Sequence, residues 1–322
     1  MNVGDLVTRA REGEPRAVAR LISMVENASP QLREVMAALT PYAGNATVIG
    51  LTGSPGVGKS TTTSALLTAY RGLGKRVGVL AIDPSSPFTG GALLGDRVRM
   101  QEHATDPGVY IRSMGTRGHL GGLSWSTPQA LRVLDAAGCD IVIVETVGVG
   151  QAEVEIASLA DSTVVLLAPG MGDGIQAAKA GILEIADVYV VNKADRDGAD
   201  HTIRDLRQMM SSVESRSPEA WQPPIVKTIA SRSEGVADLV EALDKHREWL
   251  VASGRLAARR QDRAADEIES LAVTALRAQM GDLRDATLLS DLAARVVAGE
   301  TDPYAAADDL LAAVAKDPAP KA

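Results

Sequence analysis

Aromatic residues and cysteine are scarce in this chain of 322 residues, which has one Phe, three Trp, five Tyr and one Cys. A single cysteine cannot build a disulfide framework. Because Cys139 directly precedes the apolar run 140–145, we interpret it as a small core residue at the start of a strand. The three tryptophans, Trp125, Trp221 and Trp249, are too widely spaced to form a stacking platform for nucleic-acid bases.

The chain also lacks a net positive charge and long apolar runs. Its formal net charge of −8 at pH 7 disfavours a nonspecific binder of nucleic-acid phosphates. No apolar run is long enough to span a bilayer. The N-terminal segment carries Asp5, Glu12 and Glu14, unlike the acid-poor transit peptides of organelles or a signal sequence. We therefore expect a cytoplasmic protein that binds neither nucleic acid nor a membrane.

The sequence also lacks histidines and cysteines at the spacing that is typical of metal ligands. The four histidines, His103, His119, His201 and His246, are scattered and have no cysteine cluster beside them, so we expect no nickel or zinc site. His119 lies in a Gly-rich segment. We interpret it as an exposed loop residue, with contact to a phosphate or a partner as the alternative.

What the chain does contain is the phosphate-binding pattern G-x-x-x-x-G-K-[ST] at residues 53–60. In such a loop the backbone N–H groups converge on nucleotide phosphates, Lys59 reaches the β and γ oxygens, and the Ser60 hydroxyl can ligate Mg²⁺. A buried strand is predicted before it and an amphipathic helix after it, which disfavours a merely glycine-rich turn. The predicted nucleotide-binding residues here are Gly53, Ser54, Pro55, Gly56, Val57, Gly58, Lys59, Ser60 and Thr61.

A second pattern, N-K-x-D at residues 192–195, ends another predicted strand and indicates guanine. The Asp195 carboxylate can accept from guanine's ring N–H and exocyclic amine, whereas adenine would turn a lone pair towards it. Asn192 is expected to hold the base edge and the phosphate loop, and the Lys193 stem to cover the ring. The backbone amides of Ala230 and Ser231 are expected to reach the guanine carbonyl. The alternative is a surface strand end with solvated charges.

The order of patterns along the chain indicates an α/β fold. Short β-branched runs alternate with helical patterns, which predicts a mostly parallel sheet wrapped by helices. The predicted strands are 46–52, 76–82, 109–112, 140–145, 162–168, 187–192 and 224–229. We divide the chain into an N-terminal helical arm (1–44), a P-loop domain (45–253) and a C-terminal helical arm (254–322). The last arm is expected to mediate dimerisation, with packing within one chain as the alternative.

Acidic residues at predicted strand ends suit a magnesium ion. Asp83 and Glu145 both end strands beside the phosphate loop, where ligands bind in open α/β sheets. Mg²⁺ keeps most of its waters and needs only one or two carboxylates besides the triphosphate, so Ser60, Asp83, Asp96 and Glu145 suffice. Lys59, Asp83 and Glu145 are the predicted catalytic residues. Asp83 as a turn cap and Asp96 as a helix cap are the alternatives.

Together with the two nucleotide motifs, the segments 83–100, 112–122 and 145–153 resemble the MeaB/ArgK family of P-loop GTPases nearly end to end. The resemblance implies a homodimeric GTPase, using GTP or GDP and Mg²⁺, that associates with adenosylcobalamin-dependent methylmalonyl-CoA mutase. It implies that the GTPase gates cofactor loading and protects or reactivates the mutase. It also places the four predicted metal residues around the ion and gives Asp173 and Lys179 a partner-signalling role in a switch loop. For Lys179 the alternative is a solvated charge at a strand-to-helix turn.

Intrinsic hydrolysis is expected to be slow and stimulated by the partner. Val149 stands where many GTPases carry a water-orienting glutamine, and Pro55 crowds the γ-phosphate side of the loop. Two other functions stay open. One is an ATP-dependent kinase of a periplasmic arginine/ornithine transport system, which the residues 192–195 disfavour. The other is a non-catalytic scaffold that binds nucleotide only to stabilise an interaction surface.

Overall fold

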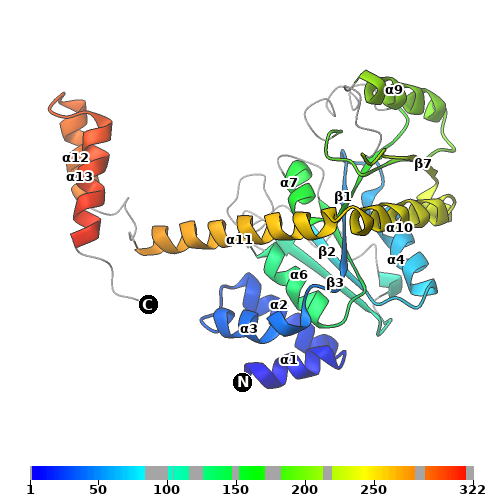
Figure 1. The fold of residues 1–322 in the computed structure, drawn as a ribbon, viewed down its shortest axis with the longest axis horizontal. Helices are drawn as coiled ribbons and strands as arrows, with labels where there is room; N and C mark the ends of the chain where they lie inside the picture. Colours follow the sequence, from blue (N-terminus) through cyan, green and yellow to red (C-terminus); the bar gives the residue numbers. More distant parts are fainter. Residues whose placement is uncertain are drawn as a thin grey trace. The chain divides into compact units, whose positions relative to one another are not determined.

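The computed structural model describes residues 2–83, 101–103, 105–115, 126–146, 152–170, 183–212, 220–279 and 287–316. Within this part, seven strands form one sheet in the order β3-β2-β4-β1-β5-β6-β7, and each neighbouring pair is parallel (Figure 1). The strands are β1 (Thr47–Thr52), β2 (Val77–Asp83), β3 (Val109–Gly115), β4 (Ile141–Thr146), β5 (Ser162–Leu167), β6 (Val188–Asn192) and β7 (Ile225–Thr228). All seven predicted strands are therefore confirmed.

Helices cover both faces of this sheet, and alternate strand residues separate the two cores. Val48 of β1 belongs to the core under the N-terminal helices, whereas its neighbour Ile49 belongs to the opposite core. The first face packs α1 (Val3–Arg11), α2 (Pro15–Glu26), α3 (Leu32–Leu39), α6 (Thr127–Ala136), α7 (Ala152–Leu159) and, beyond them, α9 (Ala199–Ser212). The second face packs α4 (Lys59–Gly72) and α10 (Val236–Ala252).

The N-terminal helices bury an apolar stripe on α2 that consists of Val18, Leu21, Ile22 and Val25. The helix α2 is also held to the edge strand β3 by the ion pair between Glu26 and Arg112. These helices therefore close the first core rather than standing apart from it. The amphipathic helix predicted after the phosphate loop is α4, which buries Leu66, Leu67 and Tyr70, whereas Leu73 lies exposed just after the helix ends.

The chain divides into two compact units, Met1–Arg260 and Gln261–Ala322, and the division falls inside the long helix α11 (Arg255–Gln279). In the second unit α12 (Thr287–Val297) and α13 (Pro303–Lys316) pack together and bury Leu292 and Ala306. Our boundaries at residues 44 and 253 remain predictions. Every helix in the described ranges is too short or too polar to cross a bilayer.

Because all strands run parallel, their ends gather at two opposite edges of the sheet. We call these the carboxyl edge, which includes Thr52, Thr146 and Asn192, and the amino edge, which includes Thr47 and Ile141. The two predicted nucleotide motifs follow β1 and β6, and both therefore lie at the carboxyl edge.

Candidate nucleotide-binding site

The loop between β1 and α4 has the backbone that only glycine adopts easily. Gly53, Gly56 and Gly58 have φ angles of 141°, 82° and 99°. A Cβ on Gly53 would lie 2.3 Å from the Leu166 carbonyl oxygen, and one on Gly58 would lie 2.4 Å from the Asn192 amide nitrogen. Since α4 starts at Lys59, directly after this loop, its first-turn N–H groups form an anion-binding end next to the loop.

Lys59 is buried and folded onto the loop that precedes it. Its Nζ donates to the carbonyl oxygens of Gly53 at 2.6 Å and Ser54 at 3.1 Å. Glu153 in the first turn of α7 lies within electrostatic reach of this ammonium. Burial raises the pKa of Glu153, and the positive charge of Lys59 works in the opposite direction. The lysine is thus held over the loop where it can move to phosphate oxygens.

Glu145 is only 3% exposed and is held by two hydroxyl groups. Ser60 Oγ donates to its Oε1 at 2.6 Å, and Thr63 Oγ1 donates to its Oε2 at 2.8 Å. A hydroxyl that donates its proton keeps its lone pairs for another partner. Ser60 can therefore remain bonded to Glu145 while it ligates a cation.

This donor set fits magnesium. Ser60 and Glu145 supply hard oxygen atoms, the kind that Mg²⁺ prefers. Within the described ranges no three His, Cys, Asp or Glu side chains converge as a metal cage. An ion that keeps several waters and binds through a triphosphate does not need such a cage. Asp83 is the last residue of β2, next to the end of β4, but its side chain is not among those described.

Asn192 connects three segments at the carboxyl edge. Its Nδ2 donates to the Val57 carbonyl oxygen in the phosphate loop at 2.8 Å. Its Oδ1 accepts from the Thr228 hydroxyl at 3.1 Å and from the Ala230 backbone N–H at 3.0 Å. The structure therefore brings together the phosphate loop, the 192–195 pattern and the segment around Ala230. The Ala230 amide that we expected to face guanine donates to Asn192 in this state.

The two charged residues of the 192–195 pattern lie beside the same loop. Lys193, with φ of 56°, extends across the loop and donates from Nζ to the Gly56 carbonyl oxygen at 2.6 Å. Asp195 Oδ2 accepts from Arg232 Nη2 at 3.1 Å. Arg232 lies in the short 3₁₀ helix η3 (Ala230–Arg232), which also contains Ser231. This exposed ion pair orients the carboxylate that we expect to recognise the base.

Some predicted residues lie outside the described ranges, namely Asp96, His119, Val149, Asp173 and Lys179. Other residues contribute to the site without having been predicted: Thr63, Glu153, Thr228 and Arg232. Thr63 stands one helical turn after Lys59, so helical spacing from the lysine is a signal that could have found it. Glu153 ends the segment 145–153 that carries the family resemblance, whereas no local pattern marks Arg232, which approaches the site through the fold.

A glycine-rich loop at a helix N-terminus, at the carboxyl edge of a parallel sheet and tied to an N-K-x-D strand end, defines a P-loop nucleoside-triphosphate-binding protein. The profile of the family described as methylmalonyl Co-A mutase-associated GTPase MeaB matches residues 18–283. The chain belongs to this family of GTPases.

Individual relatives match over most of their length. A Pyrococcus abyssi protein with a provisional GTPase name is 46% identical over 310 residues, which is 96% of each chain. GTPase ArgK of Escherichia coli is 38% identical over 272 residues, which is 82% of each chain. A crystal structure described as an LAO/AO transport system kinase has a TM-score of 0.73 at 26% identity, over 98% of this chain and 99% of that one. The predicted family, the P-loop fold and the GTPase class are confirmed.

Proposed function

We propose that this chain binds GTP and GDP at the carboxyl edge. Residues 53–61 hold the phosphates, Asn192, Lys193 and Asp195 hold guanine, and the segment at Ala230 and Ser231 closes the base site. The observation that carries this proposal is the position of Asn192, which bonds the Val57 carbonyl at 2.8 Å and the Ala230 amide at 3.0 Å. One side chain thereby couples phosphate binding to base recognition.

The metal and the catalytic groups follow from the same geometry. Bound Mg²⁺ would neutralise charge on the β and γ oxygens during phosphoryl transfer. Ser60 and Glu145 would hold it, and Asp83 and Asp96 complete the set that we propose from the sequence. Lys59, released from its two loop carbonyls, would bind the transferred phosphoryl oxygens.

Its biological role, we propose, is that of a chaperone for adenosylcobalamin-dependent methylmalonyl-CoA mutase in the cytoplasm. The family description, which names association with this mutase, supports the partner. In this proposal the GTPase gates cofactor loading and protects or reactivates the mutase, and Asp173 and Lys179 transmit the nucleotide state. Because Val149 replaces a water-orienting glutamine, the partner is expected to complete the catalytic geometry.

A homodimer is the assembly that we propose for the chain. In the second unit, α11 exposes the apolar residues Ile268, Leu271 and Leu276, and Ile268 is 68% exposed. These residues recur at helical spacing and form a stripe that a second copy could bury. Light scattering coupled to gel filtration should give the mass of two chains, and the triple change of these residues to Ser should give the mass of one. A monomeric parent protein would contradict this assembly.

One experiment separates the candidate functions. Calorimetry with GTP and ATP on the purified protein should show that only GTP binds tightly. Equal binding of ATP would favour a kinase function, the activity named in the description of the similar crystal structure. Phosphate release in single turnovers should then be slow alone and faster with purified mutase. Equal rates with and without mutase would refute partner stimulation while leaving the GTP site intact.

A further inference from the structure

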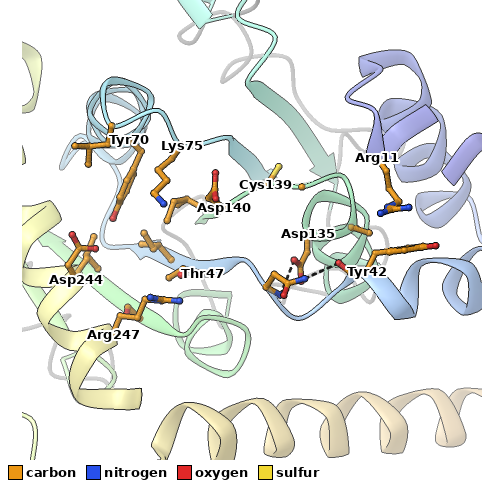
Figure 2. A pocket seen from close by; sticks show the side chains of 18 of the residues that line it. Arg11, Tyr42, Thr47, Tyr70, Lys75, Asp135, Cys139, Asp140, Asp244 and Arg247 are labelled. Carbon is orange, nitrogen blue, oxygen red and sulfur yellow. Dashed lines mark hydrogen bonds between the residues drawn. The ribbon is translucent and has the colours of Figure 1, made fainter. Parts of the chain in front are cut away.

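A cavity of about 610 Å³ opens at the amino edge of the sheet, opposite the phosphate loop (Figure 2). The first residues of three adjacent strands, Thr47, Ile141 and Ser162, line it, together with the last turn of α4 and the middle of α10. Its volume falls within the range of small-molecule sites. A ligand here would occupy a site separate from the one for nucleotide.

Two of the acids that line the cavity are engaged by the backbone. The Asp135 carboxylate accepts from the N–H groups of Gly44, Asn45 and Ala46. The Asp140 carboxylate accepts from the Arg76 N–H at 2.8 Å. These two residues therefore have a structural role, since they satisfy amides in the segments that lead into β1 and β2.

A phenol and two cationic side chains also line the cavity. Tyr70 is only 3% exposed and lines the cavity from the last turn of α4. Lys75 and Arg247 form no ion pair within the described part of the chain, although both act electrostatically on Asp244. In Figure 2, Tyr70, Lys75, Asp244 and Arg247 surround the same half of the cavity. This half of the cavity therefore offers a phenol and two cationic side chains to a polar ligand.

The phenol of Tyr70 can serve as a hydrogen-bond donor to an anion. Burial raises the pKa of Tyr70, with the Asp244 charge as a second cause, so the phenol stays neutral and can donate a hydrogen bond. Partial burial and the charge of Glu248 raise the pKa of Asp244, and because Asp244 is exposed, solvent screens its charge. The floor consists of the apolar side chains of Ile49, Ile141 and Leu243.

We propose that this cavity binds a small organic anion, with an apolar body on Ile49, Ile141 and Leu243 and a phosphate or carboxylate group between Lys75 and Arg247. Tyr70 donates a hydrogen bond to the same group. The two cations are exposed to solvent, so salt should weaken binding. Selectivity over inorganic phosphate comes from the apolar floor.

Calorimetry with phenyl phosphate, on protein saturated with GDP and again without it, tests this site. Benzoate distinguishes a carboxylate site from a phosphate site, while phenol and inorganic phosphate test each half of the ligand alone. We expect saturable binding of phenyl phosphate or benzoate that is at least fivefold tighter than binding of phenol or phosphate. Since GDP occupies only the opposite edge, affinity should be equal with and without it.

Variants connect binding to the residues. Tyr70→Phe keeps the apolar packing and should weaken binding roughly three- to tenfold, the usual effect of one lost hydrogen bond. The double change Lys75→Ala and Arg247→Ala should weaken it at least tenfold. Lys245→Ala on α10 is the matched control, because Lys245 pairs with Glu241 and does not line the cavity. No saturable binding of either anion, or equal affinity in the double variant and the control, would overturn the proposal.

Discussion

Both edges of the sheet contain buried charged residues, but the partners of these residues differ between the two edges. At the carboxyl edge, Lys59 donates to backbone carbonyls and Glu145 accepts from hydroxyls. At the amino edge, Asp187 faces Arg259 at 2.9 Å and Asp161 faces Arg260 at 2.8 Å. Neutral partners can be exchanged for ligand atoms at low cost, whereas a charged pair that loses one member leaves a buried charge behind.

The ion pairs at the amino edge therefore stabilise the fold, whereas at the carboxyl edge ligand atoms can replace the neutral hydrogen-bond partners. Arg260 also donates to the carbonyl oxygens of Gly44 and Ala46, so the start of α11 is bonded to the segment that enters β1. Asp161 is 1% exposed and additionally accepts from the Val48 N–H at 3.0 Å. Several backbone and side-chain groups would lose their partner if this carboxylate were removed.

The largest expected effects come from one substitution at each edge. Lys59→Ala should reduce GTP hydrolysis at least a hundredfold with little change in stability, because removal of a donor to developing phosphoryl charge costs about 3 kcal/mol. Asp161→Ala should lower the free energy of unfolding by about 3 kcal/mol with little change in GTP affinity. Single-turnover phosphate release and urea unfolding of both variants measure the two effects.

Asp161→Asn is the matched control for the amino edge. The amide oxygen of this variant can still accept from the Val48 N–H, but the amide carries no charge to pair with Arg260. The free energy of unfolding should therefore fall less than in Asp161→Ala. If Asp161→Ala reduced hydrolysis as strongly as Lys59→Ala, the two edges would not be separable, and the division of labour between them would be wrong.

A second prediction concerns base recognition at the carboxyl edge. Asp195→Asn should weaken GTP binding roughly 10- to 100-fold, since the amide presents one donor where guanine's two N–H groups require acceptors. The same amide matches the ring N–H and the 2-oxo group of xanthine, so XTP should bind more tightly than GTP. Competition between the two nucleotides measures the switch, and unchanged GTP preference would remove Asp195 from the base site.

The third prediction uses pH to test the amino edge. His246 is fully buried between Ser162 and Asp187, and burial lowers its pKa to about 4, against the opposing effect of Asp187 and in the same direction as Arg259. The unfolded chain takes up a proton near the ordinary pKa of about 6.5, whereas the folded chain does not until about 4. The contribution of the neutral His246 to the free energy of unfolding is therefore complete above pH 6.5. It decreases as the pH falls towards 4, and about 2 kcal/mol of it is lost at pH 5.

Urea unfolding at pH 7.5 and pH 5 measures this loss. His246→Gln has no titrating ring, so its stability should depend less on pH over the same interval, although it starts lower because the packing against Trp221 and Trp249 changes. An equal pH dependence in both proteins would assign the loss to other groups.

The sequence predicted the carboxyl edge better than the amino edge, for a physical reason. A phosphate loop needs glycine at fixed positions and a lysine and hydroxyl at fixed spacing, so the pattern 53–60 is local and readable. The contacts of Asp161 with Arg260 and of Asp187 with Arg259 join residues that lie 99 and 72 positions apart. No short pattern encodes such pairs. The strands were predictable because β-branched runs mark them, whereas the exposure of the α11 stripe depends on assembly.

The last prediction, with the smallest expected effect, concerns the ion pair between Arg232 and Asp195 at the carboxyl edge. Arg232→Ala removes the partner of Asp195, but Arg232 is 58% and Asp195 37% exposed, so we expect a change in stability of under about 1 kcal/mol. GTP affinity should change only two- to fivefold, because solvent can replace the arginine while the carboxylate still faces the base. Titration of Arg232→Ala and Arg232→Lys with GDP at low and high salt measures this. A loss as large as that of Asp195→Asn would mean that this edge, too, depends on a charged pair that is not exchangeable.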